Sequence, residues 1–425
     1  MSATTVMIVF ALALLASLLT RVWLISRQIR HVASHRGAVP AAFAATVTLT
    51  AHQRAADYTL ARQRFELLTQ AWGAAVLLGW TLLGGLDALN VPLRDALQPR
   101  LGDLGYQVAL VAAVSLIGSL LDLPFDAWRT FRIEQAFGFN RMSVGLWLRD
   151  LVVGGVVGAL VGLPLVALVL WLMAAAGTLW WLWAFGTLAG FMLVMQVVYP
   201  TWIAPLFNKF EPLADAELKT RVETLMQRCG FQARGFYVMD GSRRSAHANA
   251  YFTGFGASKR VVFFDTLLER LSGAQVEAVL AHELGHFHHR HVRQRIVTML
   301  ALWLGGLALL GWLMKQSAFY TGLGVLPNMT APNDALALLL ITMVAPVFTF
   351  YASPLLAGLS RKHEFEADAF AARQASAADL RDALLRLYED NASTLTPDPL
   401  YVRFHYSHPP ASERLAALGT LPSAA

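Results

Sequence analysis

Seven apolar stretches constrain this chain more than any other feature. Only 15% of its residues are charged, against roughly a quarter in an ordinary soluble domain. A large soluble helical core would need polar faces at helical period, and the last four stretches have no consistent polar stripe. The sequence therefore predicts a predominantly α-helical polytopic membrane protein with about seven transmembrane helices of about 20 residues each. The expected spans are residues 4–25, 71–89, 106–121, 151–175, 177–200, 296–314 and 335–358.

The distribution of arginine predicts the orientation in the membrane, because basic residues collect in short cytoplasmic loops. The segment after the first span, which includes Arg62, and the loop after the third, which includes Arg129, are both rich in arginine. Both should be cytoplasmic, so the N-terminus should lie outside. The first span lacks a basic leader and is interpreted as a retained membrane helix, not as a cleaved signal peptide.

The polar blocks divide the chain into two membrane regions and one split domain. Residues 1–200 and 296–358 should lie in the lipid bilayer, whereas 201–295 and 359–425 should form the two parts of a cytoplasmic domain. The single cysteine, Cys229, excludes an intramolecular disulfide framework and a multi-cysteine metal cluster. Nothing in the sequence resembles a nucleic-acid-binding module, so no nucleic-acid partner is expected.

Local patterns in the first polar block predict a small α+β unit. Ser272 and Gln275 form a capping-box pattern, so a helix should begin there and run to about Arg295. The second polar block is mostly helical in pattern. The other expected elements of the first block are a helix over 215–229, a strand over 236–239, and a β-hairpin of strands 250–255 and 261–264 with a five-residue loop.

The capped helix carries an HExxH motif, which is the pattern of a hydrolytic zinc site. His282 and His286 lie one turn apart, so both imidazoles can reach one ion, and Glu283 between them leans toward the same side. A catalytic zinc needs a third protein ligand and a position open to water. The longer pattern with a third histidine downstream fails, because His289 replaces its glycine and Val292 replaces its histidine. The third ligand must therefore come from elsewhere in the chain.

The segment just after the last span supplies the best candidate for that ligand. On a helix, Glu364 and Asp368 share one face, so Glu364 could bind the ion while Asp368 orients a ligand imidazole through a hydrogen bond. Glu366 would point elsewhere. The histidines that follow the motif are interpreted as a polar helix end; they are His288, His289 and His291.

Separated blocks along most of the chain match one known family. They are residues 133–140, 203–208, 240–252, 282–286, 364–368 and 405–415. On these blocks the sequence resembles the type I CAAX prenyl proteases, membrane-integral zinc metallopeptidases of family M48. The resemblance implies a seven-span helical protein around a large internal chamber, with the zinc site on the cytoplasmic side. In eukaryotic members the work is the trimming of prenylated C-terminal motifs.

The composition, rich in alanine and arginine, indicates a bacterial member of this family, which would be a multi-pass protein of the inner membrane.

The resemblance also implies roles for single residues. The roles implied are one zinc ion bound by His282, His286 and Glu364, Glu283 as general base, Asn249 near the substrate strand, and His408 and Arg414 lining the active site.

Two further hypotheses extend this interpretation toward mechanism. A tetrahedral intermediate needs a donor opposite the metal, and His408 is the candidate because neighbouring prolines fix its loop and the resemblance places it near the site. The hairpin strand 250–255 offers backbone groups to an extended peptide, which would give broad sequence tolerance.

Two alternatives from other classes stay open at this point. A site-2-type intramembrane protease carries its zinc motif inside an apolar span, whereas Arg290, Arg293 and Arg295 follow the motif here. A non-catalytic transporter or scaffold would carry the histidine helix incidentally. The expected function is a membrane-integral zinc endopeptidase that acts on extended peptide or protein substrates, either in prenyl-motif processing or in membrane protein quality control.

Overall fold

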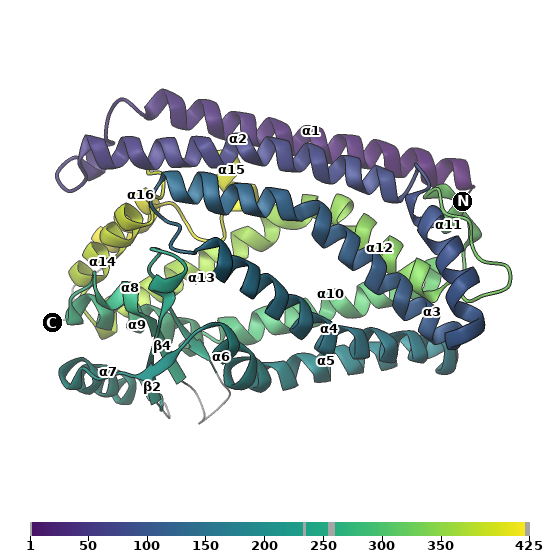
Figure 1. Ribbon diagram of the computed structural model, residues 1–425. Helices are drawn as coiled ribbons and strands as arrows, with labels where there is room; N and C mark the ends of the chain where they lie inside the picture. Colours follow the sequence, from purple (N-terminus) through teal and green to yellow (C-terminus); the bar gives the residue numbers. More distant parts are fainter. Residues whose placement is uncertain (1, 233–234, 254–259, 421–425) are drawn as a thin grey trace.

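Long helices form the membrane part of the protein (Figure 1). The computed structural model describes residues 2–232, 235–253 and 260–420. Six described helical segments are long and apolar enough to cross a bilayer. The long helices are α1 (Ala3–His35), α2 (Leu49–Trp80), α3 (Gly85–Trp128), α4 (Val144–Ala175), α5 (Trp180–Val198), α10 (His291–Leu313) and α12 (Asp334–Thr349), with α13 (Ser353–Gln374) following α12.

The ends of these helices follow from local chemistry. α1, α2 and α4 each begin after a hydroxyl residue whose oxygen accepts a backbone N–H from the first turn; the three residues are Ser2, Thr48 and Ser143. α3 begins after Gly84, which has the positive φ that glycine adopts without strain. α3 also contains a kink at Gly102 and is continued by a six-residue π-helical segment, η2 (Arg129–Glu134).

The predicted spans agree with the observed helices, except for the second predicted span. The apolar run over residues 71–89 is divided by a turn, because α2 ends at Trp80 and α3 begins at Gly85. α2 lies beside α1 over much of its length (Figure 1). It is therefore a long membrane-associated helix. Because its first half is polar, it is not one of the six segments that are both long and apolar enough to cross a bilayer.

The remaining elements gather at one end of the helical part (Figure 1). A four-stranded sheet has the order β1-β2-β4-β3, with β2 and β4 parallel and the other pairs antiparallel. Its strands are β1 (Phe210–Pro212), β2 (Gly235–Met239), β3 (Ala250–Thr253) and β4 (Arg260–Phe264). The helices are α6 (Ala204–Phe207), α7 (Ala216–Arg228), α8 (Asp265–Leu268), α9 (Gly273–His288), α14 (Ala377–Asp390), α15 (Pro399–His405) and α16 (Ala411–Gly419), while α11 (Ser317–Gly322) lies at the opposite end.

The structure confirms the small α+β unit. Residues 250–253 and 260–264 form the predicted antiparallel pair, β3 and β4, with Tyr251 opposite Val262. Residues 254–259 lie outside the described residues, and Arg260, predicted as the last loop residue, belongs to β4. Behind the sheet, one apolar cluster joins α7, β4, α9 and α14, and it includes Val222, Phe263, Leu284 and Ala383.

The predicted extent of the motif helix is wrong. The capping box of Ser272 and Gln275 is present, but α9 ends at His288 and does not continue to Arg295. Arg290 has a φ of 60°, in the left-handed region that stops a helix, and α10 begins at His291. This break changes the chain direction between the motif helix and the membrane helix that follows it.

Candidate metal centre

Two helices bring the three predicted ligands together. His282 and His286 lie on α9 and Glu364 lies on α13, and one possible ligand atom from each residue lies within 4.8 Å of the other two. His282 Nε2 is 3.4 Å from Glu364 Oε2, and His286 Nε2 is 3.4 Å from Glu364 Oε1. His282 and Glu364 are buried, whereas His286 is partly accessible.

These distances fit a tetrahedral metal. Zinc binds imidazole nitrogen and carboxylate oxygen at roughly 2.0–2.1 Å, so neighbouring ligand atoms of a tetrahedron are about 3.3 Å apart. In addition, Glu364 Oε2 is buried and, although His408 Nδ1 lies 2.8 Å away, it accepts no hydrogen bond of good geometry. A buried carboxylate oxygen without a hydrogen bond is costly unless a cation satisfies it. The donor set therefore fits zinc, and the partly accessible ligand is His286.

Close packing between α9 and α13 fixes this arrangement. A Cβ atom on Gly285 would lie 2.9 Å from the Cα of Ala367, so only glycine allows the two helices to approach this closely. Gly285 precedes His286, and Ala367 lies one helical turn from Glu364. The small residues thus set the spacing at which the side chains of the two helices meet.

A buried ion pair supports the candidate ligand His282. Asp368 Oδ1 lies 2.8 Å from His282 Nδ1, which leaves Nε2 directed at the metal position. Arg414, on α16, binds the same carboxylate through Nε at 2.8 Å and Nη2 at 2.5 Å. Asp368 and Arg414 are only 1% and 6% exposed, so Arg414 lies behind the ligands and its contacts are with Asp368, His282 and Glu364.

This environment changes the protonation of His282 when no metal is bound. Burial opposes the charged ring, but hydrogen bonds to Asp368 and Glu364 outweigh it and raise the pKa of His282 to about 9. A zinc ligand must be a neutral imidazole, so zinc has to displace this proton.

Zinc binding to the metal-free protein should therefore depend strongly on pH. Below pH 9 the proton on His282 competes with the metal, so the apparent affinity should rise about tenfold per pH unit from pH 6 toward 9 and then level off. Competition with a chromophoric chelator at several pH values measures this. An affinity that stays constant over this range would contradict the assigned proton.

A second chain of hydrogen bonds reaches His286, and the sequence interpretation missed it. His286 Nδ1 lies 3.0 Å from His291 Nδ1, and His291 Nε2 lies 2.8 Å from Glu366 Oε2. With His286 Nε2 at the metal, its Nδ1–H donates to His291, whose Nε2–H in turn donates to Glu366. His291 is not a plain polar helix end, because it is buried and orients a candidate ligand.

His291, His363 and Glu366 form a second group with metal-ligand chemistry, again within 4.8 Å of one another. The rings of His291 and His363 stack with centroids 4.0 Å apart and 10° between their planes, so their nitrogens do not converge on one point. A metal bound to His291 Nε2 would also place the His291 proton on Nδ1. That proton would then face the Nδ1–H of His286, and the hydrogen bond between the two rings would be lost. The first group is therefore the better metal centre.

Replacing His291 should weaken metal binding without removing a ligand. The substitution His291→Phe keeps a ring in the buried position but leaves His286 Nδ1 without its acceptor, and such losses typically reduce metal affinity about 10–100-fold. Zinc retained against a graded series of chelator concentrations measures the effect. His288→Phe, at the exposed end of α9, is the control and should bind zinc normally. Equal affinities of both variants would show that His291 does not orient His286.

The other predicted site residues occupy different positions around this group. No hydrogen-bond or ion-pair partner among the described residues holds the carboxylate of Glu283. His408 lies on the loop between α15 and α16, with Nδ1 2.8 Å from Glu364 Oε2 and its side chain 66% exposed. Asn249 stands just before β3, where its carbonyl accepts the N–H of Phe264. β3 itself adjoins the motif helix, since the rings of Phe252 and Phe287 lie 5.2 Å apart.

A membrane-embedded helical scaffold with an HExxH helix and a distant glutamate defines a membrane metallopeptidase. Family models match both halves: "CAAX prenyl protease N-terminal, five membrane helices" over residues 28–209 and "Peptidase family M48" over 212–421. The chain belongs to peptidase family M48, and it is a membrane zinc metalloprotease of the CAAX prenyl protease type.

Individual relatives agree with this membership. CAAX prenyl protease 1 homolog of Arabidopsis thaliana is 35% identical over 77% of each chain. CAAX prenyl protease 1 of Saccharomyces cerevisiae is 32% identical over 85% of this chain and 84% of the yeast protein. The crystal structure of S. mikatae Ste24p superimposes with a TM-score of 0.91 at 27% identity, covering 97% of this chain and 99% of that one. These relatives match the peptidase interpretation and neither of the two alternatives.

Proposed function

We propose that the protein is an endopeptidase that holds one zinc ion between His282, His286 and Glu364. The observation that carries this proposal is the convergence of three ligand atoms from two helices, with spacings close to the edge of a zinc tetrahedron. We infer a cytoplasmic position for the site from the arginine-rich segments on the same predicted side of the membrane.

Glu283 serves as the general base in this proposal. When bound, zinc would lower the pKa of a water molecule toward about 7 and polarise the scissile carbonyl. Glu283 follows the ligand His282 directly and has no partner among the described side chains, so its carboxylate is available to a water in the site. It accepts a proton from that water and returns it to the leaving amine.

His408 stabilises the oxyanion that develops on the scissile carbonyl. Its ring is largely accessible, it lies beside Glu364, and Pro409 and Pro410 restrict its loop. A donor held in advance near the developing charge needs no reorganisation during the reaction. Arg414 acts from behind by holding Asp368, which orients His282.

Strand β3 provides the binding edge for an extended substrate. It is the last strand of the sheet order, so one of its edges has no partner strand among the described residues, and it adjoins α9. A peptide that pairs with this edge gains main-chain hydrogen bonds with little side-chain preference. Asn249, just before the strand, is placed to contact the peptide. The substrates are extended peptides or membrane proteins, in prenyl-motif processing or in quality control.

The substitution Glu283→Gln separates base from ligand. Because Glu283 does not bind the metal in this scheme, the variant should keep about one zinc per chain while peptide cleavage falls at least about 100-fold. Metal analysis and a fluorogenic peptide assay on the purified protein measure the two quantities. Cleavage at the normal rate would eliminate Glu283 as the base.

The substitution Glu364→Gln tests the third ligand. An amide oxygen is a much weaker zinc ligand than a carboxylate, so zinc content should fall well below one per chain and activity should fall with it. Lys362→Gln, an exposed position on the same helix, is the matched control and should retain its metal. Normal zinc occupancy in the Glu364 variant would mean that the third ligand lies elsewhere.

A further inference from the structure

A short segment, residues 244–249, leads directly into strand β3 and is bonded on two sides. On the membrane side, the N–H of Ala246 donates to the carbonyl of Phe139, in the connection between η2 and α4, at 3.1 Å. On the side of the sheet, the hydroxyl of Thr266 donates to the carbonyl of His247 at 3.0 Å. This lead-in segment therefore links the membrane helices to the strand that is proposed to bind substrate.

The side chain of His247 ties the lead-in segment to three other parts of the chain. Its Nδ1–H donates to Oδ1 of Asn391, directly after α14, across 3.0 Å. Its Nε2 lies 3.8 Å from Oε2 of Glu134 in η2, which is ion-pair distance. The ring also stacks on Phe139, with centroids 4.3 Å apart and 16° between the planes. One imidazole thus joins η2, the connection that follows it and the end of α14.

The partners of His247 are themselves fixed by other contacts. Tyr58 on α2 is buried, and its hydroxyl lies 2.8 and 2.9 Å from the two carboxylate oxygens of Glu134. Oδ1 of Asn391 also accepts the backbone N–H of Ala248 at 3.4 Å. Glu134 ends the π-helical segment η2, and π-helical turns are rare and frequently occur at functional sites. These contacts define where the imidazole must lie.

The position of His247 determines the position of the strand that follows. Asn249, two residues later, can lie at most about 7 Å along the chain from His247. The carbonyl of Asn249 accepts the N–H of Phe264 at 3.0 Å, so this residue also sets where β3 begins to pair with β4. Hydrogen bonds from a strand edge to a peptide weaken steeply outside a narrow range of distance and angle. A small displacement at His247 would therefore weaken them.

We propose that His247 is a positioning residue for substrate binding: by tying the lead-in segment to η2 and α14, it sets the place of Asn249 and of β3. This inference rests on the proposed peptidase function. His247 does not touch the metal ligands, which lie on α9 and α13. Loss of an interaction that acts equally on bound substrate and transition state raises KM and leaves kcat unchanged. The role assigned to His247 predicts this pattern.

The substitution His247→Phe tests the role in the full-length, zinc-loaded protein. Phenylalanine keeps a ring beside Phe139 but removes both nitrogens. KM for an extended fluorogenic peptide should rise about tenfold, the effect of one lost hydrogen bond, while kcat changes less than about twofold. His288→Phe makes the same chemical change at an exposed position of α9 and is the matched control. It should leave both parameters at their wild-type values.

Two milder variants separate positioning from general support of the fold. His247→Asn keeps a donor near the place of Nδ1 and loses only the group that faces Glu134, so KM should return to within about threefold of wild type. Glu134→Gln should raise KM by a similar factor. The double variant should be no worse than either single one, because both remove the same contact. Additive effects would overturn the link between His247 and η2.

The remaining results distinguish this proposal from the function on which it rests. If the wild-type protein does not cleave the peptide, the peptidase function itself fails. If His247→Phe keeps the wild-type KM, or lowers kcat alone, cleavage stands but the positioning role is overturned. If the Phe and Asn variants lose zinc and unfold at lower temperature to the same extent, His247 only supports the fold, and the proposal is again overturned.

Discussion

The contact between α9 and α13 at Gly285 and Ala367 is the constraint on which the site depends. The two ligand-bearing segments lie far apart in the chain and are separated by two membrane helices, α10 and α12. Their side chains meet because small residues let the backbones approach to a distance that no Cβ on Gly285 would allow. The membrane helices between them return the chain to the same side of the bundle. The position of Glu364 beside the two histidines therefore depends on these helices as well as on the motif.

Charge balance at this centre explains why a metal belongs to the fold. Glu364, Asp368 and Arg414 are all less than 9% exposed, and one guanidinium offsets only one of the two carboxylates. In the metal-free protein the raised pKa of His282 keeps a second positive charge beside Glu364, and once that ring is neutral the second carboxylate has no cation to offset it. Because an uncompensated buried charge is expensive, a divalent cation would stabilise the packed arrangement of α9, α13 and α16 as well as enable chemistry.

Local patterns predicted much of this structure, and long-range contacts explain the rest. The capping box, the hairpin and the i, i+4 histidines depend on neighbouring residues, so they could be read directly from the sequence. Glu364 was predicted as a ligand because catalytic zinc requires a third one, and the resemblance pointed to the same residue. The pairing of His291 with Glu366 joins residues 75 positions apart, and no periodicity signals it. The helix end at Arg290 was missed because a non-glycine residue adopts a positive φ there.

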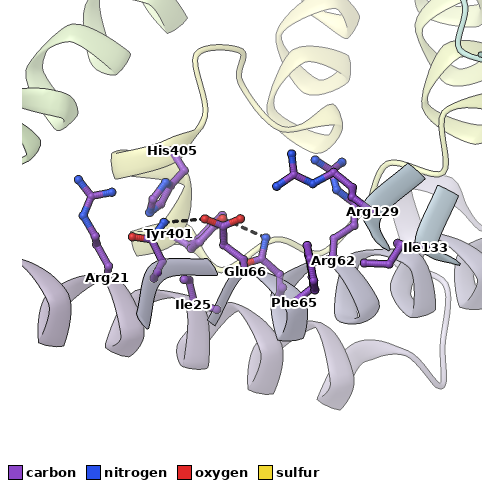
Figure 2. A pocket seen from close by; sticks show the side chains of 11 residues that line it. Arg21, Ile25, Arg62, Phe65, Glu66, Arg129, Ile133, Tyr401 and His405 are labelled. Carbon is purple, nitrogen blue, oxygen red and sulfur yellow. Dashed lines mark hydrogen bonds between the residues drawn. The ribbon is translucent and has the colours of Figure 1, made fainter. Parts of the chain in front are cut away.

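Arg62 and Arg129 show a second limit of sequence patterns. Their position in basic segments predicts the orientation of the chain in the membrane. It does not indicate that both residues line one cavity together with Arg21 (Figure 2). A strand edge such as β3 binds peptide backbone with little discrimination between sequences. An enzyme with such an edge in a membrane full of other proteins needs another source of selectivity.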